Sequence, residues 1–333
     1  MSAPPATGRR LLVTGASGFI GSAILRAARG RIRQRIGFCR RPAPVDDVEM
    51  IAGDAGDRRR VDEAMRGATV VIHAAGLAHR TSGLPPSAWT DANVTGTRTV
   101  VEAAVAAGVS RIVCVSSVSV YGSHDHVVTE ETPCRPVGPY ASSKHDAEVE
   151  ARRIAAGAGV PLCVVRPATV IGPGDPGSVA RLARLLHRRR FVARGDGRAR
   201  KCLIGVTDVA EACLRIATAE PPDDDTYNLA GPPVHLEQIV RVLADALGAP
   251  EPRVKVPQRI VEWTLAGLSR VEPYSDGVGW VAHGLRAWLA DHVYDVSRYE
   301  ARYGRLARTD WRAVLRDEAR WLRTRWSGAA RPR

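Results

Sequence analysis

The length, composition and charge of the chain exclude several classes of protein. Its 333 residues exceed the usual domain of about 100 to 150 residues, so we expect one large or two interleaved domains with a sizeable core. With 45% hydrophobic and 25% charged residues, the chain is typical of a soluble globular protein and not of a disordered or fibrous one. The net charge of +13 comes mostly from arginines spread along the chain, so we expect no nucleic-acid partner.

The cysteines and the N-terminal segment indicate a cellular compartment. The six cysteines have neither a CxxC spacing nor a His/Cys metal spacing, so we expect reduced thiols and no metal site. The uncharged run over 11–25 follows Arg9-Arg10 and could imitate a secretion signal, but its regularly spaced glycines are typical of a nucleotide-binding turn. No other run of about 18 apolar residues occurs, so we expect a cytoplasmic protein without a membrane span.

Short apolar runs alternate with helical patterns through the first half of the chain. The runs are rich in β-branched residues and lack polar alternation, which predicts strands of a parallel sheet that is buried on both faces. Strand–helix alternation predicts an α/β fold, namely a doubly wound parallel sheet of the Rossmann type. The predicted strands are 11–14, 35–39, 48–51, 69–73, 111–116 and 161–166, and the predicted helices are 21–29, 59–65, 94–107 and 140–156.

The character of the sequence changes after Arg166-Pro167. A Gly/Pro loop over 172–177 leads into a basic helix over 179–190, whereas 199–217 and 226–229 again have the pattern of the sheet and its helices. We therefore expect a smaller domain interleaved with the larger one. The expected boundaries are 9–166 with returns over about 201–231 and 292–300 for the larger domain, 167–200 and 232–291 for the smaller domain, and 301–327 for a C-terminal helix.

The segment from Thr14 to Gly21, TGASGFIG, follows a predicted strand and opens a predicted helix. Gly15 would permit a tight turn, Gly18 would let backbone N–H groups reach a pyrophosphate, and Gly21 would let the helix pack closely on the strand. The helix N-terminus adds its positive end. The larger domain is therefore predicted to bind a dinucleotide, and the smaller one a substrate.

The end of the second predicted strand bears on the choice of dinucleotide. It reads Phe38-Cys39-Arg40-Arg41, where an NAD-binding protein would usually place an acidic residue. The guanidinium groups of Arg40 and Arg41 could hold a 2′-phosphate, which favours NADP, with NAD as the alternative. A solvated basic turn is the simpler interpretation of the same residues. Asp54, after the third strand, would contact the adenine edge or form an ordinary turn.

Tyr140 and Lys144 are four residues apart on a predicted helix, so their side chains share one face. An ammonium there would stabilise a phenolate and lower the tyrosine pKa from about 10, so that Tyr140 could move a proton at neutral pH. Ser117 follows a strand predicted to end at the cofactor edge of the sheet, where its hydroxyl could donate to a substrate oxygen. Serines at strand ends are also common turn residues.

These motifs, taken in order, resemble those of the extended short-chain dehydrogenase/reductases, the NAD(P)-dependent epimerase/dehydratase group. The likeness runs from about residue 9 to about residue 325. The ordered set is far more specific than any one of its members. The segments are Thr14 to Gly21, Gly53-Asp54, His73 to Gly76, Asn93 to Thr97, Ser116 to Gly122, Tyr140 to Lys144, and Arg166-Pro167.

The resemblance implies roles for individual residues. Tyr140 would be the acid/base, Lys144 its partner at the nicotinamide ribose, and Ser117 the donor to the substrate oxygen. Asn93 would correspond to the helix asparagine that supports Lys144. The implied cofactor-binding residues are Gly15, Gly18, Phe19, Ile20, Gly21, Arg40, Arg41, Asp54, Ala74, Ala75, Gly76, Tyr140, Lys144 and Pro167.

Departures from the family pattern bear on the substrate. Val118-Ser119 follow Ser117 where sugar-nucleotide 4,6-dehydratases carry an Asp-Glu pair, which disfavours a dehydratase of that type. The second-domain asparagine that is common in sugar-nucleotide enzymes is replaced near Ser178, and Lys201 stands where an arginine is usual. Arg286 could match the second arginine of a diphosphate site. The implied substrate-binding residues are Ser117, Ser178, Lys201 and Arg286.

We therefore expect an enzyme that passes hydride between nicotinamide C4 and a carbinol or carbonyl carbon of a small molecule. A nucleotide sugar is the first choice of substrate, with epimerisation or ketoreduction as the reaction, and a homodimer is left open. The stretches 256–270 and 291–297 also resemble the 3β-hydroxysteroid dehydrogenase and dihydroflavonol reductase branch, whose substrates are apolar alcohols and ketones. A non-catalytic dinucleotide-binding regulator is a third alternative, disfavoured because a sensor needs no proton donor such as Tyr140.

Overall fold

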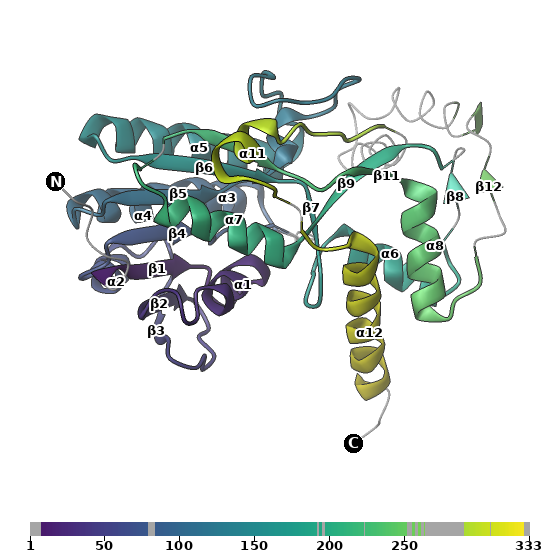
Figure 1. The fold of residues 1–333 in the computed structure, drawn as a ribbon, viewed down its shortest axis with the longest axis horizontal. Helices are drawn as coiled ribbons and strands as arrows, with labels where there is room; N and C mark the ends of the chain where they lie inside the picture. The colour runs from purple at the N-terminus through teal and green to yellow at the C-terminus, as the bar shows by residue number, and fades with distance from the viewer. Residues whose placement is uncertain are drawn as a thin grey trace.

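The centre of the molecule is a seven-stranded sheet with the strand order β10-β6-β5-β4-β1-β2-β3 (Figure 1). Every pairing in it is parallel, which confirms the doubly wound Rossmann-type fold predicted above. The strands are β1 (Arg10–Thr14), β2 (Gln34–Cys39), β3 (Glu49–Ala52), β4 (Val70–His73), β5 (Arg111–Val115), β6 (Leu162–Pro167) and β10 (Thr226–Leu229). This computed structural model describes residues 8–78, 84–191, 193–194, 197–222, 224–251, 255–256, 259–260, 263, 290–306 and 308–329.

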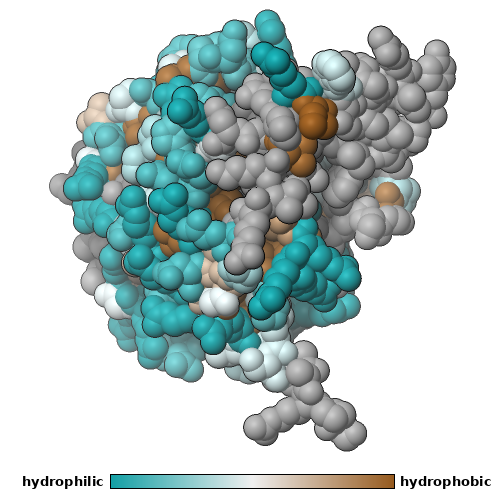
Figure 2. All heavy atoms as spheres, turned by 90° about the vertical axis from the view of Figure 1, so that its right-hand side faces the viewer, coloured by the Kyte–Doolittle hydropathy of each residue, from teal (hydrophilic) through white to brown (hydrophobic). Residues whose placement is uncertain are grey.

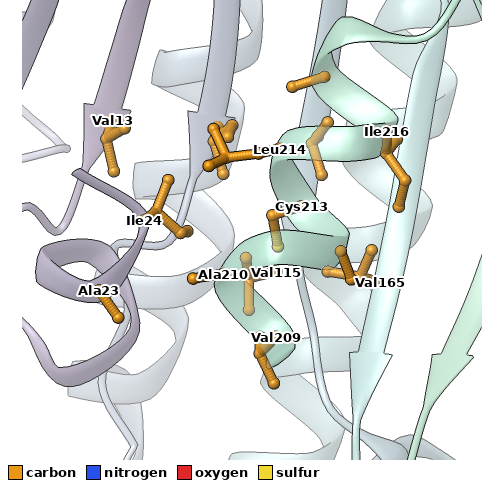
Figure 3. Close-up of a cluster of buried hydrophobic side chains, with 14 of the residues drawn as sticks. Val13, Ala23, Ile24, Val115, Val165, Val209, Ala210, Cys213, Leu214 and Ile216 are labelled. Atoms are coloured by element: carbon orange, nitrogen blue, oxygen red, sulfur yellow. The ribbon is translucent and has the colours of Figure 1, made fainter. Parts of the chain in front are cut away.

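Both faces of this sheet are buried under helices. Alternate strand residues such as Val13 and Val115 point into one apolar core, where α7 packs against α1 and the strands (Figure 3). The intervening residues, such as Leu12 and Ile112, point into a second core on the opposite face. The first face is covered by α1 (Phe19–Ala27) and α7 (Val206–Thr218), and the second by α2 (Arg58–Met65), α4 (Gly96–Ala106) and α5 (Gly138–Ala158).

Local signals in the sequence set the ends of these helices. The side chain of Asp57 accepts a hydrogen bond from the Arg60 N–H at 3.2 Å and so caps the start of α2. Pro139 lies in the first turn of α5, where its missing N–H costs nothing. Gly159 ends α5 in the left-handed conformation, with φ 66°. The predicted helix over 140–156 is therefore observed with one extra half-turn at each end.

The second half of the chain contributes to two layers. While β10 joins the main sheet beside β6, a smaller sheet lies apart from it, with β9 parallel to β7 and antiparallel to β11. Three helices, α6, α8 and α12, pack into one apolar cluster next to the smaller sheet. These elements are β7 (Thr169–Ile171), α6 (Ser178–His187), β9 (Arg200–Gly205), β11 (Pro233–His235), α8 (Leu236–Leu247) and α12 (Trp311–Ala329).

The C-terminal helix expected over 301–327 is observed over Trp311–Ala329, because Gly304, with φ 75°, ends the separate helix α11 (Ser297–Tyr303). The short strands β8 (Ala193–Arg194) and β12 (Lys255–Val256) pair in parallel. Figure 2 faces the end of the molecule that carries α8 and α12. The described residues there are mainly hydrophilic, with small separate hydrophobic patches, because the helices turn their apolar sides inward.

A buried ion pair ties the main sheet to α5. Arg166 on β6 donates from Nε to Glu148 Oε1 on α5 at 3.0 Å, and the two side chains are 9% and 5% exposed. Arg166 Nη1 also donates to the Tyr121 hydroxyl at 2.8 Å, which in turn donates to Asn228 Oδ1 at 2.8 Å. The network fixes β6, α5 and β10 relative to the segment that follows β5.

We expect Glu148→Ala to lower the free energy of unfolding by about 3 to 5 kcal/mol, because it leaves the Arg166 guanidinium buried without its counter-charge. Urea denaturation measures the change. Glu102→Ala is the matched control, since Glu102 forms an exposed ion pair with Arg58 that contributes about 0 to 1 kcal/mol. Equal losses in the two variants would contradict the role given to the buried pair.

Candidate active site

The glycine turn between β1 and α1 has no room for side chains. A Cβ on Gly15, whose φ is +68°, would lie 2.6 Å from the Ala74 carbonyl oxygen, and one on Gly21 would lie 2.2 Å from the Gly15 oxygen. The Gly18 N–H donates to the Gly15 carbonyl at 2.8 Å, which closes the turn. The three glycines thus bring the start of α1 against the carboxyl ends of β1 and β4.

A first cavity of about 460 Å³ opens at this turn. Gly15 and Gly18 line one side, and Arg40, Arg41 and Asp54, at the ends of β2 and β3, line the other. Asp54 Oδ1 also accepts a hydrogen bond from the Gly56 N–H at 2.9 Å, so it serves the turn and faces the cavity at once. A backbone-lined turn at one side and guanidinium groups at the other fit a dinucleotide, which would supply or accept hydride when bound.

His73, at the end of β4, directly precedes Ala74 and Ala75, which line this cavity. Its Nδ1 lies 2.7 Å from Thr14 Oγ1 and its Nε2 lies 3.0 Å from Thr97 Oγ1. Burial, together with the charge of Lys144, lowers the His73 pKa to about 3, so the ring is neutral at physiological pH. Thr14 Oγ1 also accepts from the Ala75 N–H at 3.3 Å. The sequence motif contained His73, but its residue type alone did not indicate this positioning role.

A second cavity, also of about 460 Å³, meets the first at Ala74 and Gly76, which line both. It brings together Ser117, Tyr140 and Lys144. Ser117 precedes the short helix η3 (Val118–Tyr121), and its side chain hydrogen-bonds with that of Tyr140. The other predicted cofactor residues that line the second cavity are Phe19, Ile20 and Pro167.

The electrostatics of Tyr140 differ from the expectation based on spacing. Burial raises the Tyr140 pKa, and the hydrogen bond with Ser117 acts in the opposite direction. The Lys144 ammonium instead donates to the Val115 carbonyl at 2.9 Å, and burial lowers the Lys144 pKa. Sharing one face of α5 therefore does not by itself couple the two groups, because the long lysine side chain extends to the end of β5. Tyr140 is a neutral phenol in this geometry.

Asn93 links the segment after β4 (residues 74–78) to α5, the helix that carries Tyr140 and Lys144. It lies in the π-helix η2 (Thr90–Thr95), which follows the short helix α3 (Pro86–Trp89), and such π-turns are frequent at functional sites. Its Oδ1 accepts from the Leu77 N–H at 2.7 Å, and its Nδ2 donates to Ser143 Oγ at 2.9 Å. Asn93 thus holds Ser143, the residue before Lys144, and supports the lysine through the helix.

The predicted substrate residues do not all line the second cavity. Ser178, the first residue of α6, lines the second cavity. Lys201 on β9 is not among the residues that line it: its ammonium donates to the Ala290 carbonyl, and burial lowers its pKa to about 8. Arg286 lies outside the described residues. Arg181, which sequence reasoning treated only as part of a basic helix, lines the cavity one turn after Ser178. The i, i+3 spacing of the two was the available signal.

Other features of the described residues are simpler. Five of the six cysteines are buried and Cys134 is half-buried, and all are free thiols. No group of three or more His, Cys, Asp or Glu side chains in the described part of the chain is arranged to hold a metal ion. None of the described helices combines the length and apolar character needed to cross a bilayer.

The glycine turn, the two adjoining cavities and the Ser117, Tyr140 and Lys144 side chains define a dinucleotide-dependent enzyme of the extended short-chain dehydrogenase/reductase class. Residues 11–230 match the NAD dependent epimerase/dehydratase family. The chain belongs to this family.

Three similar proteins illustrate the range of the family. The chain is 28% identical to sterol demethylase protein B of Methylococcus capsulatus, over 94% of this chain and 98% of the relative. It is 30% identical to N-acetyl-alpha-D-glucosaminyl-diphospho-ditrans,octacis-undecaprenol 4-epimerase of Escherichia coli O157:H7, over 74% and 75%. The solved structure of MoeE5 with UDP-glucose and NAD is 28% identical and has a TM-score of 0.76, over 95% and 99%.

We expect Tyr140→Phe to lower turnover at least about 10²-fold while the affinity for the dinucleotide changes little, because the variant keeps the ring and loses the hydroxyl. Lys144→Met should lower both turnover and affinity. Steady-state rates and calorimetric titration measure the two effects. Tyr303→Phe, which removes a hydroxyl from α11, is the control. Near-normal turnover in Tyr140→Phe would remove Tyr140 as the acid/base.

Proposed function

We propose that the protein transfers hydride between nicotinamide C4 and a carbinol or carbonyl carbon of a nucleotide sugar, as an epimerase or a ketoreductase. The observation that carries this proposal is the second cavity, whose lining includes Tyr140 and Ser117 together with Ser178 and Arg181 of α6. Proton-transfer groups and a cation in the wall of one cavity suit a substrate that has both a reacting hydroxyl and a phosphate.

The proposed roles at the reacting carbon follow from the hydrogen bonds described above. Tyr140 donates or accepts the proton of the substrate oxygen, and Ser117, bonded to the Tyr140 hydroxyl, orients that oxygen. Lys144, whose ammonium donates to the Val115 carbonyl, supplies a positive charge in the wall of the second cavity. Asn93 holds the neighbouring Ser143 and keeps this part of α5 in place.

Arg181 is the proposed phosphate ligand of the substrate site. Its exposed guanidinium can bind a diphosphate by charge-assisted, bidentate hydrogen bonds, and Ser178 offers a hydroxyl one turn away. Lys201 is a weaker candidate because it already donates to the Ala290 carbonyl. Arg286 keeps the role that the family pattern implies for it. The UDP-glucose bound by MoeE5, at 28% identity, supports a ligand of this chemistry.

Dehydration is not part of the proposal. Val118 and Ser119 occupy the positions after Ser117 and line the second cavity, so those positions offer no carboxylate to the substrate. Asp175 is the acidic side chain among the described residues that line this cavity, and its oxygens accept hydrogen bonds from the backbone of α6. Hydride transfer with proton transfer by Tyr140 needs no such carboxylate.

An apolar alcohol or ketone is the second candidate substrate. The likeness to sterol demethylase protein B, which spans 94% of the chain, favours it. A nucleotide sugar has a diphosphate that needs a cationic side chain in the protein, whereas a sterol has no phosphate. The role of Arg181 therefore separates them.

We expect UDP or dTDP to raise the melting temperature of the protein by mass action. In Arg181→Ala the apparent Kd of either nucleotide should rise about tenfold or more, so the melting temperature should rise less at the same concentration. Thermal denaturation at several nucleotide concentrations measures both. Arg184→Ala is the matched control, because Arg184 is exposed on the next turn of α6 and does not line either cavity. Protection by a sterol, with none by either nucleotide, would favour the second candidate.

We also propose NADP as the preferred dinucleotide. Arg40 and Arg41 line the first cavity at the end of β2, and guanidinium groups bind a 2′-phosphate bidentately. We expect NADPH to bind more tightly than NADH, and the double variant Arg40→Ala with Arg41→Ala to narrow the difference. Calorimetric titration of both dinucleotides measures it, with Arg59→Ala as an exposed control on α2. Equal affinities in the unmodified protein would contradict the preference.

A further inference from the structure

A buried pair of carboxyl groups connects the C-terminal helix to the wall of the second cavity. Glu318 on α12 is 0% exposed, and Asp175, which lies between β7 and α6, is 6% exposed. Asp175 lines the second cavity, whereas Glu318 lies behind it and does not line either cavity. Two acidic side chains buried together require an explanation, because two adjacent buried charges are strongly unfavourable.

Burial raises the Asp175 pKa, but Asp175 accepts hydrogen bonds that favour its ionised form. Its Oδ1 accepts from the Gly177 N–H at 2.6 Å and its Oδ2 from the Ala180 N–H at 3.2 Å. These N–H groups belong to the start of α6, where the helix has no cap from its own N-cap residue. A negative charge at a helix N-terminus is stabilised by the helix dipole. Asp175 therefore fixes the turn that presents Ser178 and Arg181 to the cavity.

Glu318 has the surroundings of a neutral carboxylic acid. Its Oε2 accepts from the Gly172 N–H at 3.0 Å, but its Oε1 is buried and meets no donor among the described residues. A proton on Glu318 removes this deficit, because the carboxyl can then donate to Asp175. Burial and the charge of Asp175 raise the Glu318 pKa to about 9, which agrees with that arrangement.

The remaining neighbours do not supply a counter-charge to Glu318. Arg181 acts on Asp175, from the cavity side of the pair. On α12 itself, Leu315 and Leu322, one turn away in each direction, are apolar and buried. Among the described residues, the other elements packed around α12 contribute an apolar cluster that includes Leu203 of β9 and Leu243 of α8.

We propose that Glu318 is a positioning residue of the substrate site: as a neutral acid it shares a proton with Asp175 and so holds the first turn of α6 against the second cavity. Through this hydrogen bond, α12 positions Ser178 and Arg181 of α6, which line the second cavity. Its effect on a nucleotide sugar rests on the function proposed above, whereas its effect on α6 does not depend on the substrate.

The proposal predicts how stability depends on pH. Between pH about 4.5 and about 9 the folded protein keeps a proton on Glu318 that the unfolded chain has lost, so stability falls as pH rises through this range. Glu318→Gln cannot titrate, yet its amide can donate to Asp175 and its carbonyl can accept from Gly172. Its melting temperature should therefore fall less steeply over this range than that of the unmodified protein.

Hydrogen exchange at the start of α6 tests the positioning without any substrate. In Glu318→Leu we expect the Gly177 and Ala180 amides to exchange about tenfold faster, because the shared proton and the acceptor for Gly172 are both lost. Glu318→Gln should exchange at the normal rate. Asp317→Asn, an exposed neighbour on α12, is the control. Unchanged exchange in Glu318→Leu, or a steep pH dependence retained in Glu318→Gln, would overturn the proposal.

The substrate readout is a split between KM and kcat. In Glu318→Leu we expect the KM for UDP-glucose to rise about tenfold while kcat and the dinucleotide affinity stay within about twofold, and Glu318→Gln should restore the KM. A normal KM together with faster exchange would show that Glu318 holds α6 without serving the substrate, which overturns the proposed role. If the unmodified protein binds no nucleotide sugar, the proposed function fails, and the exchange and pH experiments still decide whether Glu318 positions α6.

Discussion

The burial of both faces of the seven-stranded sheet is the constraint on which the rest of the structure depends. Its central strands are apolar in both directions, so polar side chains can reach ligands only where the strands end. His73 is the last residue of its strand, and the Gly15 turn, Asp54 and Ser117 come just after the carboxyl ends of theirs. Because parallel strands bring these ends to one edge, residues far apart in sequence meet there, and the cavities open at that edge and not on a face.

Polar groups that remain inside the protein act as fixed connectors. Neutral His73 joins the ends of β1 and β4 to α4 through hydrogen bonds with Thr14 and Thr97. Asn93 joins the segment after β4 (residues 74–78) to α5. Their hydrogen bonds are satisfied by neighbours in the fold, so loss of one partner leaves an unpaired buried group. This is how a scaffold made of apolar strands can hold catalytic side chains to within fractions of an ångström.

Much of the fold and part of the site could be predicted from the sequence, for local reasons. Strand runs, the TGASGFIG turn and the Tyr140 to Lys144 spacing are short-range patterns, and their place in the order of strands fixes where they meet. Arg181 had one sequence signal, its i, i+3 spacing from Ser178, whereas Glu318 could not be found in this way. The role of Glu318 depends on how α6 and α12 pack together, which no spacing in the sequence encodes. The Lys201 ammonium donates to the Ala290 carbonyl, which comes from a distant part of the chain, and no spacing near Lys201 indicates this acceptor.

The electrostatics of Tyr140 and Glu318 follow one rule with different outcomes. Burial opposes ionisation of both, and each is therefore neutral in the structure. For Tyr140 the Ser117 hydroxyl partly offsets this penalty, and a neutral phenol is the form that donates a proton when a carbonyl is reduced. For Glu318 the Gly172 N–H opposes the effect of burial, but the charge of Asp175 adds to it, so the proton on Glu318 is held more firmly. The same low-dielectric interior thus keeps two acids protonated, one in the wall of the second cavity and one within the scaffold behind it.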